Sequence, residues 1–145
     1  NAPWYLAVAT TLGVLAGVAQ FLGLLRWSFL VPTLADRYVH PKASQATRDS
    51  VAVVFEAFHR YAGVAIGEHL GYLFTALWTI ILCIAIIQSA LVNPLLGWLG
   101  IIPALGVLTG VLEEIDFKPA GVINAISYIL WSLWLIAFGV ALLLQ

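Results

Sequence analysis

The chain has 145 residues, of which 63% are hydrophobic and only 9% are charged. Soluble domains have about a quarter of their residues charged, so this composition excludes a compact water-soluble fold and indicates a lipid bilayer as the environment. The formal net charge of −1 excludes nucleic-acid binding, which would require a strongly basic face. The lone cysteine, Cys83, excludes a disulfide framework or a thiolate metal site.

Four apolar stretches are long enough to cross a membrane as helices. A hydrocarbon core about 30 Å thick requires roughly 20 helical residues. The predicted spans are residues 4–27, 68–90, 95–112 and 120–144. They predict an all-α fold, a four-helix transmembrane bundle that forms one integral membrane domain over residues 1–145.

The basic residues predict how the spans are oriented. All six lie in, or beside, the first and third connections: Arg26, Arg37, Lys42, Arg48, Arg60 and Lys118. The short connection on the opposite side, around Asn93, carries no charge. Under the positive-inside rule the basic side is cytoplasmic. Residues 32–60 are therefore predicted to be cytoplasmic, and both ends of the chain are predicted to lie on the other side.

An amphipathic pattern precedes the second span. From Ser50 onward, apolar residues recur at helical spacing: Val51, Val54, Phe55, Phe58, Tyr61, Ala62 and Ala65. The pattern predicts one long helix from about Ser50 to Ala90, whose first turns form a juxtamembrane extension. Its polar face is either exposed to water or a docking face for another helix or subunit.

Glycines at four-residue intervals predict where helices approach closely. The pattern occurs in three of the four helices, at Gly13 and Gly17, at Gly63, Gly67 and Gly71, and at Gly106 and Gly110. Small residues at this spacing allow two helix backbones to pack closely in lipid. The spacing leaves open whether the neighbour belongs to the same chain or to a partner.

Charged and histidine side chains gather near one membrane boundary. Ionisable groups in a membrane span are candidates for function, but none is predicted near the midplane, which disfavours an ion pump or secondary transporter. The candidate ligands of a metal ion or haem are Glu56, His59, Glu68, His69, Glu113 and Glu114. The spacing of Glu56 and His59 is that of di-iron bundles, although only one such motif is present. The alternative is a charge network, with Glu68 paired to Arg26 or Arg60.

Polar and aromatic residues of the second and fourth spans form a second candidate site. An indole N–H within hydrocarbon requires a hydrogen-bond acceptor. A cleft for a lipid-like or aromatic ligand is one interpretation, and core packing with hydrogen bonds between helices is the other. The residues are Trp78, Asn124, Tyr128, Trp131 and Trp134.

Three segments carry a family resemblance. They are LGLLRWSFLVPTLADRY, VVFEAFHRYAGVAIGEHLGYLFTALWT and KPAGVINAISYILWSLWLIAFGV. Together they resemble an uncharacterised family of bacterial multi-span integral membrane proteins, a numbered domain of unknown function. The resemblance implies a bacterial plasma-membrane location, and it implies no activity and no particular cofactor.

No recognisable catalytic constellation is present, which favours a protein that is not an enzyme. The leading hypothesis is a small membrane protein that acts as an accessory subunit of a larger complex or binds a lipid-like ligand. The alternative is a membrane-embedded metal or haem protein that uses the Glu and His residues given above. The predicted partners are the lipid bilayer and either another membrane subunit or a second copy of the chain.

Overall fold

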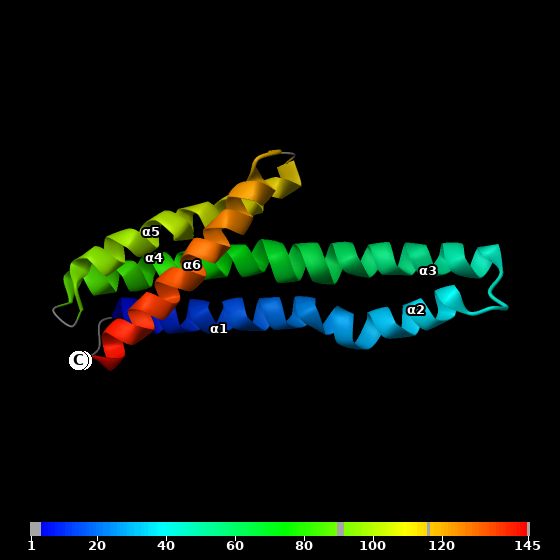
Figure 1. Ribbon diagram of the computed structural model, residues 1–145, viewed down its shortest axis with the longest axis horizontal. Coiled ribbons are helices and arrows are strands. Elements are labelled where there is room, and N and C mark those ends of the chain that lie inside the picture. Colours follow the sequence, from blue (N-terminus) through cyan, green and yellow to red (C-terminus); the bar gives the residue numbers. More distant parts are fainter. Residues whose placement is uncertain (1–3, 90–91, 116, 145) are drawn as a thin grey trace. The chain divides into compact units, whose positions relative to one another are not determined.

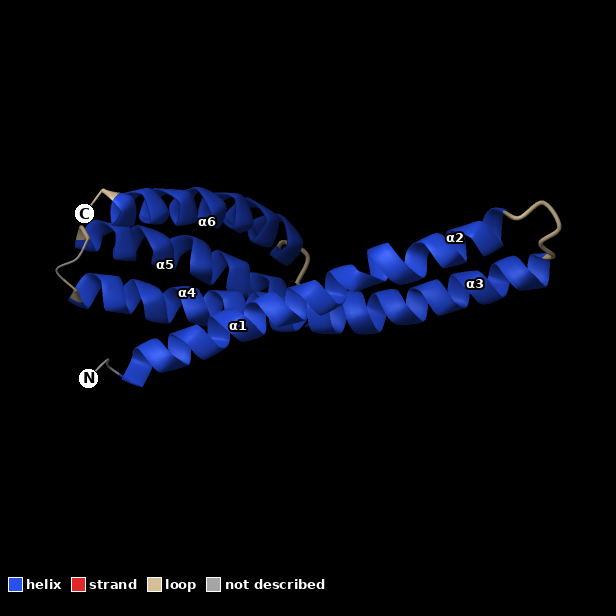
Figure 2. Ribbon diagram, turned by 90° about the horizontal axis from the view of Figure 1, so that it is seen from below, coloured by secondary structure: helices blue, strands red, loops and turns tan. Residues whose placement is uncertain are grey.

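The computed structural model describes residues 4–89, 92–115 and 117–144. Its α-helices are α1 (Trp4–Leu25), α2 (Val31–Val39), α3 (Gln45–Phe58), α4 (Gly71–Gln88), α5 (Pro94–Leu108) and α6 (Ala120–Leu143) (Figure 1). π-Helical segments, Arg26–Leu30 and His59–Leu70, join α1 to α2 and α3 to α4, and a 3-10 helix, Thr109–Ile115, follows α5. These described residues include no β-strand (Figure 2).

The predicted all-α fold with four membrane-spanning helices is confirmed. Four helical runs are long and apolar enough to cross a bilayer: Trp4–Val39, Gln45–Gln88, Pro94–Ile115 and Ala120–Leu143. The protein is therefore a multi-pass membrane protein. The predicted end of the second span, at Ala90, lies outside the described residues. The two chain termini, whose side of the membrane was also predicted, lie outside them as well.

The first connection is more helical than its polar sequence indicated. Of residues 32–50, only the stretch from His40 to Ser44 is not helical. The extension of the second span begins at Gln45 rather than at Ser50, because Ser44 caps the helix by accepting the N–H of Thr47 at 3.1 Å. The π-helical segment before α2 has a local cause, since Pro32 lacks an N–H and its ring clashes with the carbonyl one turn earlier.

The chain divides into two compact units. The bundle unit comprises Asn1–Ala16 and Tyr72–Gln145, and the hairpin unit comprises Gly17–Gly71. In the hairpin unit, α2 and α3 pack against each other as an antiparallel pair, with Val51 buried. In the bundle unit, α5 packs along α6, and a core cluster forms around Cys83, Ile86 and Trp134.

Small residues of α5 determine how closely its neighbours approach. A Cβ atom on Gly100 would lie 2.5 Å from Cys83 Sγ and 2.5 Å from the Trp134 ring. Gly106 lies against Ser127, and Gly110, in the 3-10 helix that follows α5, lies against Asn124 and Tyr72. The predicted pair Gly106 and Gly110 thus faces residues of its own chain.

The two glycines predicted in the first span differ in their surroundings. A Cβ atom on Gly13 would lie 3.0 Å from the indole of Trp78. A Cβ atom on Gly17 would meet no described atom within 4 Å. Gly13 therefore permits a close approach to an aromatic ring, whereas Gly17 is open.

Candidate functional site

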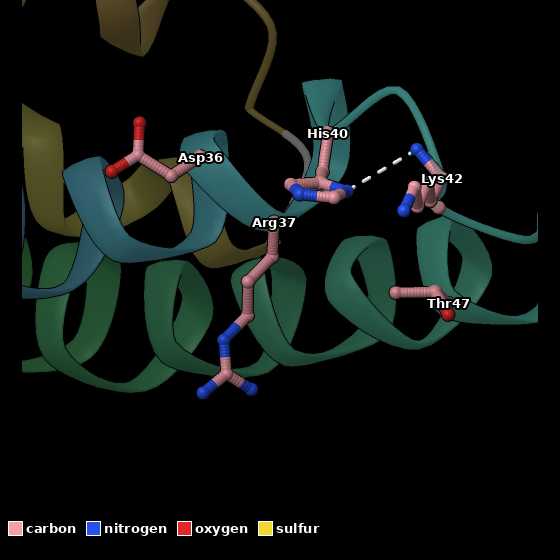
Figure 3. A pocket seen from close by; sticks show the side chains of 6 residues that line it. Asp36, Arg37, His40, Lys42 and Thr47 are labelled. Atoms are coloured by element: carbon pink, nitrogen blue, oxygen red, sulfur yellow. Dashed lines mark hydrogen bonds between the residues drawn. The ribbon is translucent and has the colours of Figure 1, made fainter.

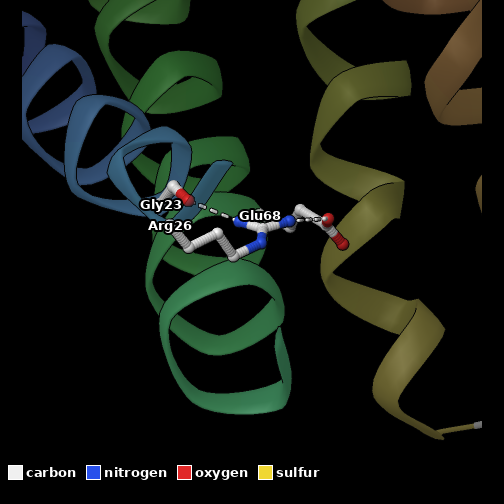
Figure 4. Close-up of polar contacts among 3 residues, drawn as sticks. All are labelled: Gly23, Arg26 and Glu68. Carbon is white, nitrogen blue, oxygen red and sulfur yellow. Dashed lines mark hydrogen bonds and ion pairs between the residues drawn. The ribbon is translucent and has the colours of Figure 1, made fainter. Parts of the chain in front are cut away.

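The most unusual charged group of the hairpin unit is Arg26, whose side chain is only 9% exposed. Its Nη1 donates to the carbonyl oxygen of Gly23 at 2.5 Å, and its Nη2 lies 4.0 Å from Oε1 of Glu68 (Figure 4). Its guanidinium carbon also lies 5.2 Å from the ring centroid of Trp27. A carbonyl dipole, a carboxylate and an aromatic face therefore share the stabilisation of this cation.

Gly63 provides the space that the guanidinium occupies. A Cβ atom on Gly63 would lie 2.5 Å from Cζ of Arg26 and less than 3.0 Å from both of its terminal nitrogens. Because a helix without a side chain at this position leaves a hollow, a planar cation can lie flat against the backbone. We refer to Arg26 and Gly63 together as the arginine seat.

The other two glycines of the same predicted stripe face the first span in the same way. A Cβ atom on Gly67 would lie 2.9 Å from the Cα of Gly23, and one on Gly71 would lie 2.9 Å from Cγ of Gln20. The stripe therefore packs against its own chain. The packing role of Gly23 was not predicted, although Gln20, Gly23 and Arg26 recur every three residues and so share one face of a helix.

Three aromatic rings near the arginine seat, those of Trp27, Phe55 and His59, form an aromatic column. The ring of Trp27 lies 6.4 Å from that of Phe55, edge to face, and Phe55 stacks on His59 at 5.7 Å with an interplanar angle of 2°. Nδ1 of His59 is buried and has no hydrogen-bond partner among the described residues. The stacking holds the His59 ring in a packed aromatic contact, with its Nδ1 left unsatisfied by the described residues.

The remaining members of the predicted Glu and His layer are more dispersed. Glu56 is exposed on α3, and His69 is partly buried. Glu113 and Glu114 belong to the bundle unit, where both are exposed and Glu113 lies near Gly121 at the start of α6. Among the residues that the structure describes, no three His, Cys, Asp or Glu side chains are grouped closely enough to hold a metal ion.

The tryptophans predicted to line a ligand cleft donate hydrogen bonds between helices of the bundle unit. Nε1 of Trp131 donates to Oγ1 of Thr79 at 2.9 Å, and Nε1 of Trp134 donates to the carbonyl oxygen of Leu96 at 2.7 Å. Nδ2 of Asn124 donates to the carbonyl oxygen of Val107 at 2.8 Å. A ligand at this position would have to replace these bonds, which are costly to leave unmade in hydrocarbon.

The aromatic rings around these donors contact one another. Tyr128 lies 5.6 Å from Tyr72 and 5.9 Å from Trp131, and Trp131 lies 6.2 Å from Trp78, measured between ring centroids. These separations are typical of favourable aromatic pairs. Three of the predicted cleft residues, Trp78, Tyr128 and Trp131, are therefore joined with Tyr72 into one aromatic cluster.

The tip of the hairpin unit is polar. A hollow of about 430 Å³ is lined by charged or polar side chains together with Ala43. Within it, the backbone N–H of Lys42 donates a hydrogen bond to Nδ1 of His40 at 3.2 Å (Figure 3). Asp36 and Arg37, of opposite charge, lie on its α2 side. The side chain of Arg37 points away from His40 and Lys42 (Figure 3). This arrangement is typical of a turn exposed to water.

Between the tip and the arginine seat, the two helices of the hairpin unit form an apolar groove. The groove has a volume of about 320 Å³. Leu34, Tyr38 and Val39 of α2 line one side, and Val51 and Phe55 of α3 line the other. Tyr38 is 48% exposed and Val39 is 71% exposed, so the groove is open. We call this feature the hairpin groove.

Comparison with known proteins identifies the family of the chain. Residues 2–139 match the family described as a domain of unknown function, DUF4386. No curated protein and no solved structure matches the chain. The family match spans both units and includes the arginine seat, the hairpin groove and the tryptophan donors, and it confirms the resemblance noted in the sequence. The chain belongs to the DUF4386 family of domains of unknown function.

Proposed function

We propose that the protein is a non-enzymatic accessory component of a larger membrane assembly, and that it binds another polypeptide through the hairpin groove. The supporting observation is the open apolar groove of the hairpin unit, which lies between two helical runs longer than one membrane crossing requires. The helical runs Trp4–Val39 and Gln45–Gln88 contain 36 and 44 residues. A hydrocarbon core of about 30 Å takes roughly 20 helical residues, so each run has more residues than one crossing requires.

The charges indicate which end of these helices lies in water. Seven of the thirteen charged residues occur between positions 36 and 60, whereas the opposite ends of the same helices are apolar. An apolar groove that faces water is unfavourable unless something covers it. Two antiparallel helices with an open groove resemble an incomplete bundle, which a third helix would complete. The proposed partner is therefore an amphipathic helix of another protein.

Photo-crosslinking in native membranes tests this proposal. A photoreactive amino acid placed at Tyr38 or Phe55 should crosslink to one discrete polypeptide. Val53 supplies a matched control, because it is apolar and 66% exposed but points about 160° away from Phe55 around α3. Equal crosslinking at Val53, or crosslinking at Tyr38 and Phe55 to lipid only, would contradict the proposal. Crosslinks to a second copy would show self-association instead.

The proposed partner must also depend on the groove itself. Replacing Val39 by glutamate should abolish the crosslink from Phe55, because a charge would then enter the apolar groove. Replacing Val53 by glutamate should leave that crosslink unchanged. If both variants retain the crosslink, the captured polypeptide does not bind in the groove.

We further propose that the hairpin unit faces the cytoplasm of a bacterial cell from its plasma membrane. The six basic residues support this orientation. A thiol reagent that cannot cross membranes provides the test, since the native Cys83 is buried. Cysteine at Ser50 should react only in inside-out vesicles, and cysteine at Asn93 should react only in intact cells whose outer barrier has been removed. The reverse pattern would invert the topology.

A metal or haem protein is the second candidate function. The observation that favours it is the buried Nδ1 of His59, which lacks a hydrogen-bond partner among the described residues. Elemental mass spectrometry of protein purified from native-like membranes should then find about one metal atom per chain, which His59→Ala would remove. If His59→Ala leaves the number of metal atoms per chain unchanged, any retained metal is bound by residues other than His59.

A further inference from the structure

We infer that the bundle unit holds one acyl chain of a membrane phospholipid in a hollow formed by α1, α4 and α6. The hollow has a volume of about 300 Å³ and is only partly enclosed. Its walls include Tyr5 and Leu6 of α1, Leu82 and Ala85 of α4, and Phe138 and Leu142 of α6. All of these residues belong to the bundle unit. Its lining shares no residue with the hairpin groove or with the tryptophan donors.

The depth of the hollow follows from the positions of its lining residues along their helices. It lies where α1 begins, at Trp4, and where α4 and α6 end, at Gln88 and Leu143. Ser89 lines its rim, and Leu82 lies two helical turns further along α4. At about 1.5 Å per residue the lining therefore extends about 10 Å along α4 from the end of that predicted membrane-spanning run.

The lining of the hollow is polar near the helix ends and apolar deeper in, which matches the polar end and apolar chain of a lipid. The two lining residues that carry hydroxyl groups, Tyr5 and Ser89, stand next to helix ends, Tyr5 at the start of α1 and Ser89 just after α4. The hydroxyl of Ser89 donates to the carbonyl oxygen of Ile86 at 3.1 Å and retains capacity to accept a hydrogen bond. The deeper lining, including Leu82, Ala85 and Phe138, is apolar. A molecule with an apolar chain and a polar end at the interface matches this gradient.

The surroundings determine what fills the hollow. Water is disfavoured in the deep part, because an apolar cavity offers no hydrogen-bond partners. An empty hollow is also disfavoured, because its lining loses dispersion contacts. The three helices that form the hollow belong to candidate membrane spans, so the expected surrounding solvent is hydrocarbon, and the hollow is only partly enclosed. An acyl chain of an adjacent phospholipid is therefore the occupant that we assign.

The walls of the hollow are rigid, which distinguishes an acyl chain bound there from the loosely held lipids that surround any membrane protein. Ile86 and Val92, which form part of the lining, are 4% and 7% exposed and belong to the buried core cluster. The ring of Phe138 stacks on that of Trp134 at 5.6 Å with an interplanar angle of 4°. Trp134 is in turn fixed by its hydrogen bond to Leu96. A preformed site loses little entropy on binding and so retains its ligand longer.

Native mass spectrometry of the full-length protein, purified in mild detergent with added 1-palmitoyl-2-oleoyl-phosphatidylethanolamine, tests the inference. The wild-type protein should keep one phospholipid at collision energies that remove all others. Ala85→Phe places a ring in the hollow and should reduce that retained population at least tenfold. Ala125→Phe, on the exposed surface of α6, is the matched control and should behave like the wild type.

Three results would overturn the inference. In the first, Ala85→Phe and the wild-type protein retain the phospholipid equally. In the second, the wild-type protein loses its lipids with no single adduct preferred. In the third, it retains a free fatty acid or detergent in place of phospholipid. A second measurement uses the wild-type protein alone, in case Ala85→Phe does not fold. A phospholipid with a photoreactive group in its palmitoyl chain should label residues 82–89 and 138–142. Labelling spread evenly over the exposed faces of α5 and α6 would contradict the site.

Discussion

The bundle unit and the hairpin unit stabilise their helix contacts by different chemistry. In the bundle unit, indole and amide N–H groups of α6 donate to acceptors on α4 and α5, and small residues allow the rings to pack closely. In the hairpin unit, a glycine stripe accommodates one buried cation beside a half-exposed carboxylate. Neutral hydrogen-bond donors therefore stabilise helix contacts within the predicted spans. A charged side chain stabilises a helix contact only near the predicted membrane boundary, where its guanidinium can remain close to water.

The largest expected effect is at the packed glycines of the bundle unit. Gly100→Ala would force a Cβ atom into the space of Cys83 and Trp134. Because neither neighbour is a flexible chain end, we expect the free energy of unfolding to fall by about 3 kcal/mol. The measurement is an SDS titration of protein in mixed micelles. Gly139→Ala is the control, since a Cβ atom there meets no described atom within 4 Å, and it should change the stability by less than about 1 kcal/mol.

The arginine seat should give a smaller but more specific effect. Gly63→Ala would displace the Arg26 guanidinium, which can shift, so we expect a loss of about 1–2 kcal/mol. A double-mutant cycle sharpens the comparison, because the cost of Gly63→Ala should nearly vanish when Arg26 is already alanine. Additive losses in the double variant would mean that Gly63 acts on something other than Arg26. Gly17→Ala, in the same unit, is the open control.

The tryptophan donors should each contribute less than the packed glycines. Trp134→Phe keeps an aromatic ring but leaves the carbonyl oxygen of Leu96 without its donor, and we expect a loss of about 1 kcal/mol. Trp98→Phe is the matched control, because Trp98 is 60% exposed on α5. If both substitutions change the free energy of unfolding equally, the loss reflects ring size and not the hydrogen bond.

The ion pair of Arg26 and Glu68 should give the smallest effect. The two groups are 4.0 Å apart and the Glu68 side chain is 40% exposed, so water and salt screen the attraction. Glu68→Gln should lower the stability by about 0.5 kcal/mol or less, and this difference should shrink further in 1 M salt. A loss as large as that of Gly63→Ala would mean that the carboxylate, rather than the seat, stabilises the cation.

Sequence patterns predicted the four spans because length and apolar composition alone determine them. They did not reveal α2, which has nine residues and lies in a polar stretch that is too short to show a clear helical period. The pairing of Glu68 was also underdetermined. Helical-wheel positions assume 100° per residue, and residues 59–70 form a π-helical segment with a wider turn. Glu68 therefore reaches Arg26, on the side of the glycine stripe, although a regular wheel separates it from that stripe.

The candidate sites were predictable only in part. The sequence indicated that Trp131 and Trp134 require acceptors, but Thr79 and the carbonyl oxygen of Leu96 become identifiable only when the helices pack. The hairpin groove and the lipid hollow were not predicted, because each combines residues of separate helices whose side chains are individually ordinary. Concave sites depend on the spacing between helices, and that spacing is not encoded in the pattern of any one helix.

The arginine seat restricts which sequence changes the family can accept. Lysine cannot replace Arg26 equivalently, because an ammonium group lacks the planar surface that lies against Gly63 and over Trp27. Conversely, a side chain at position 63 should cost least where position 26 has become smaller. The two positions are therefore expected to covary among homologues, with arginine and glycine inherited together and lost together.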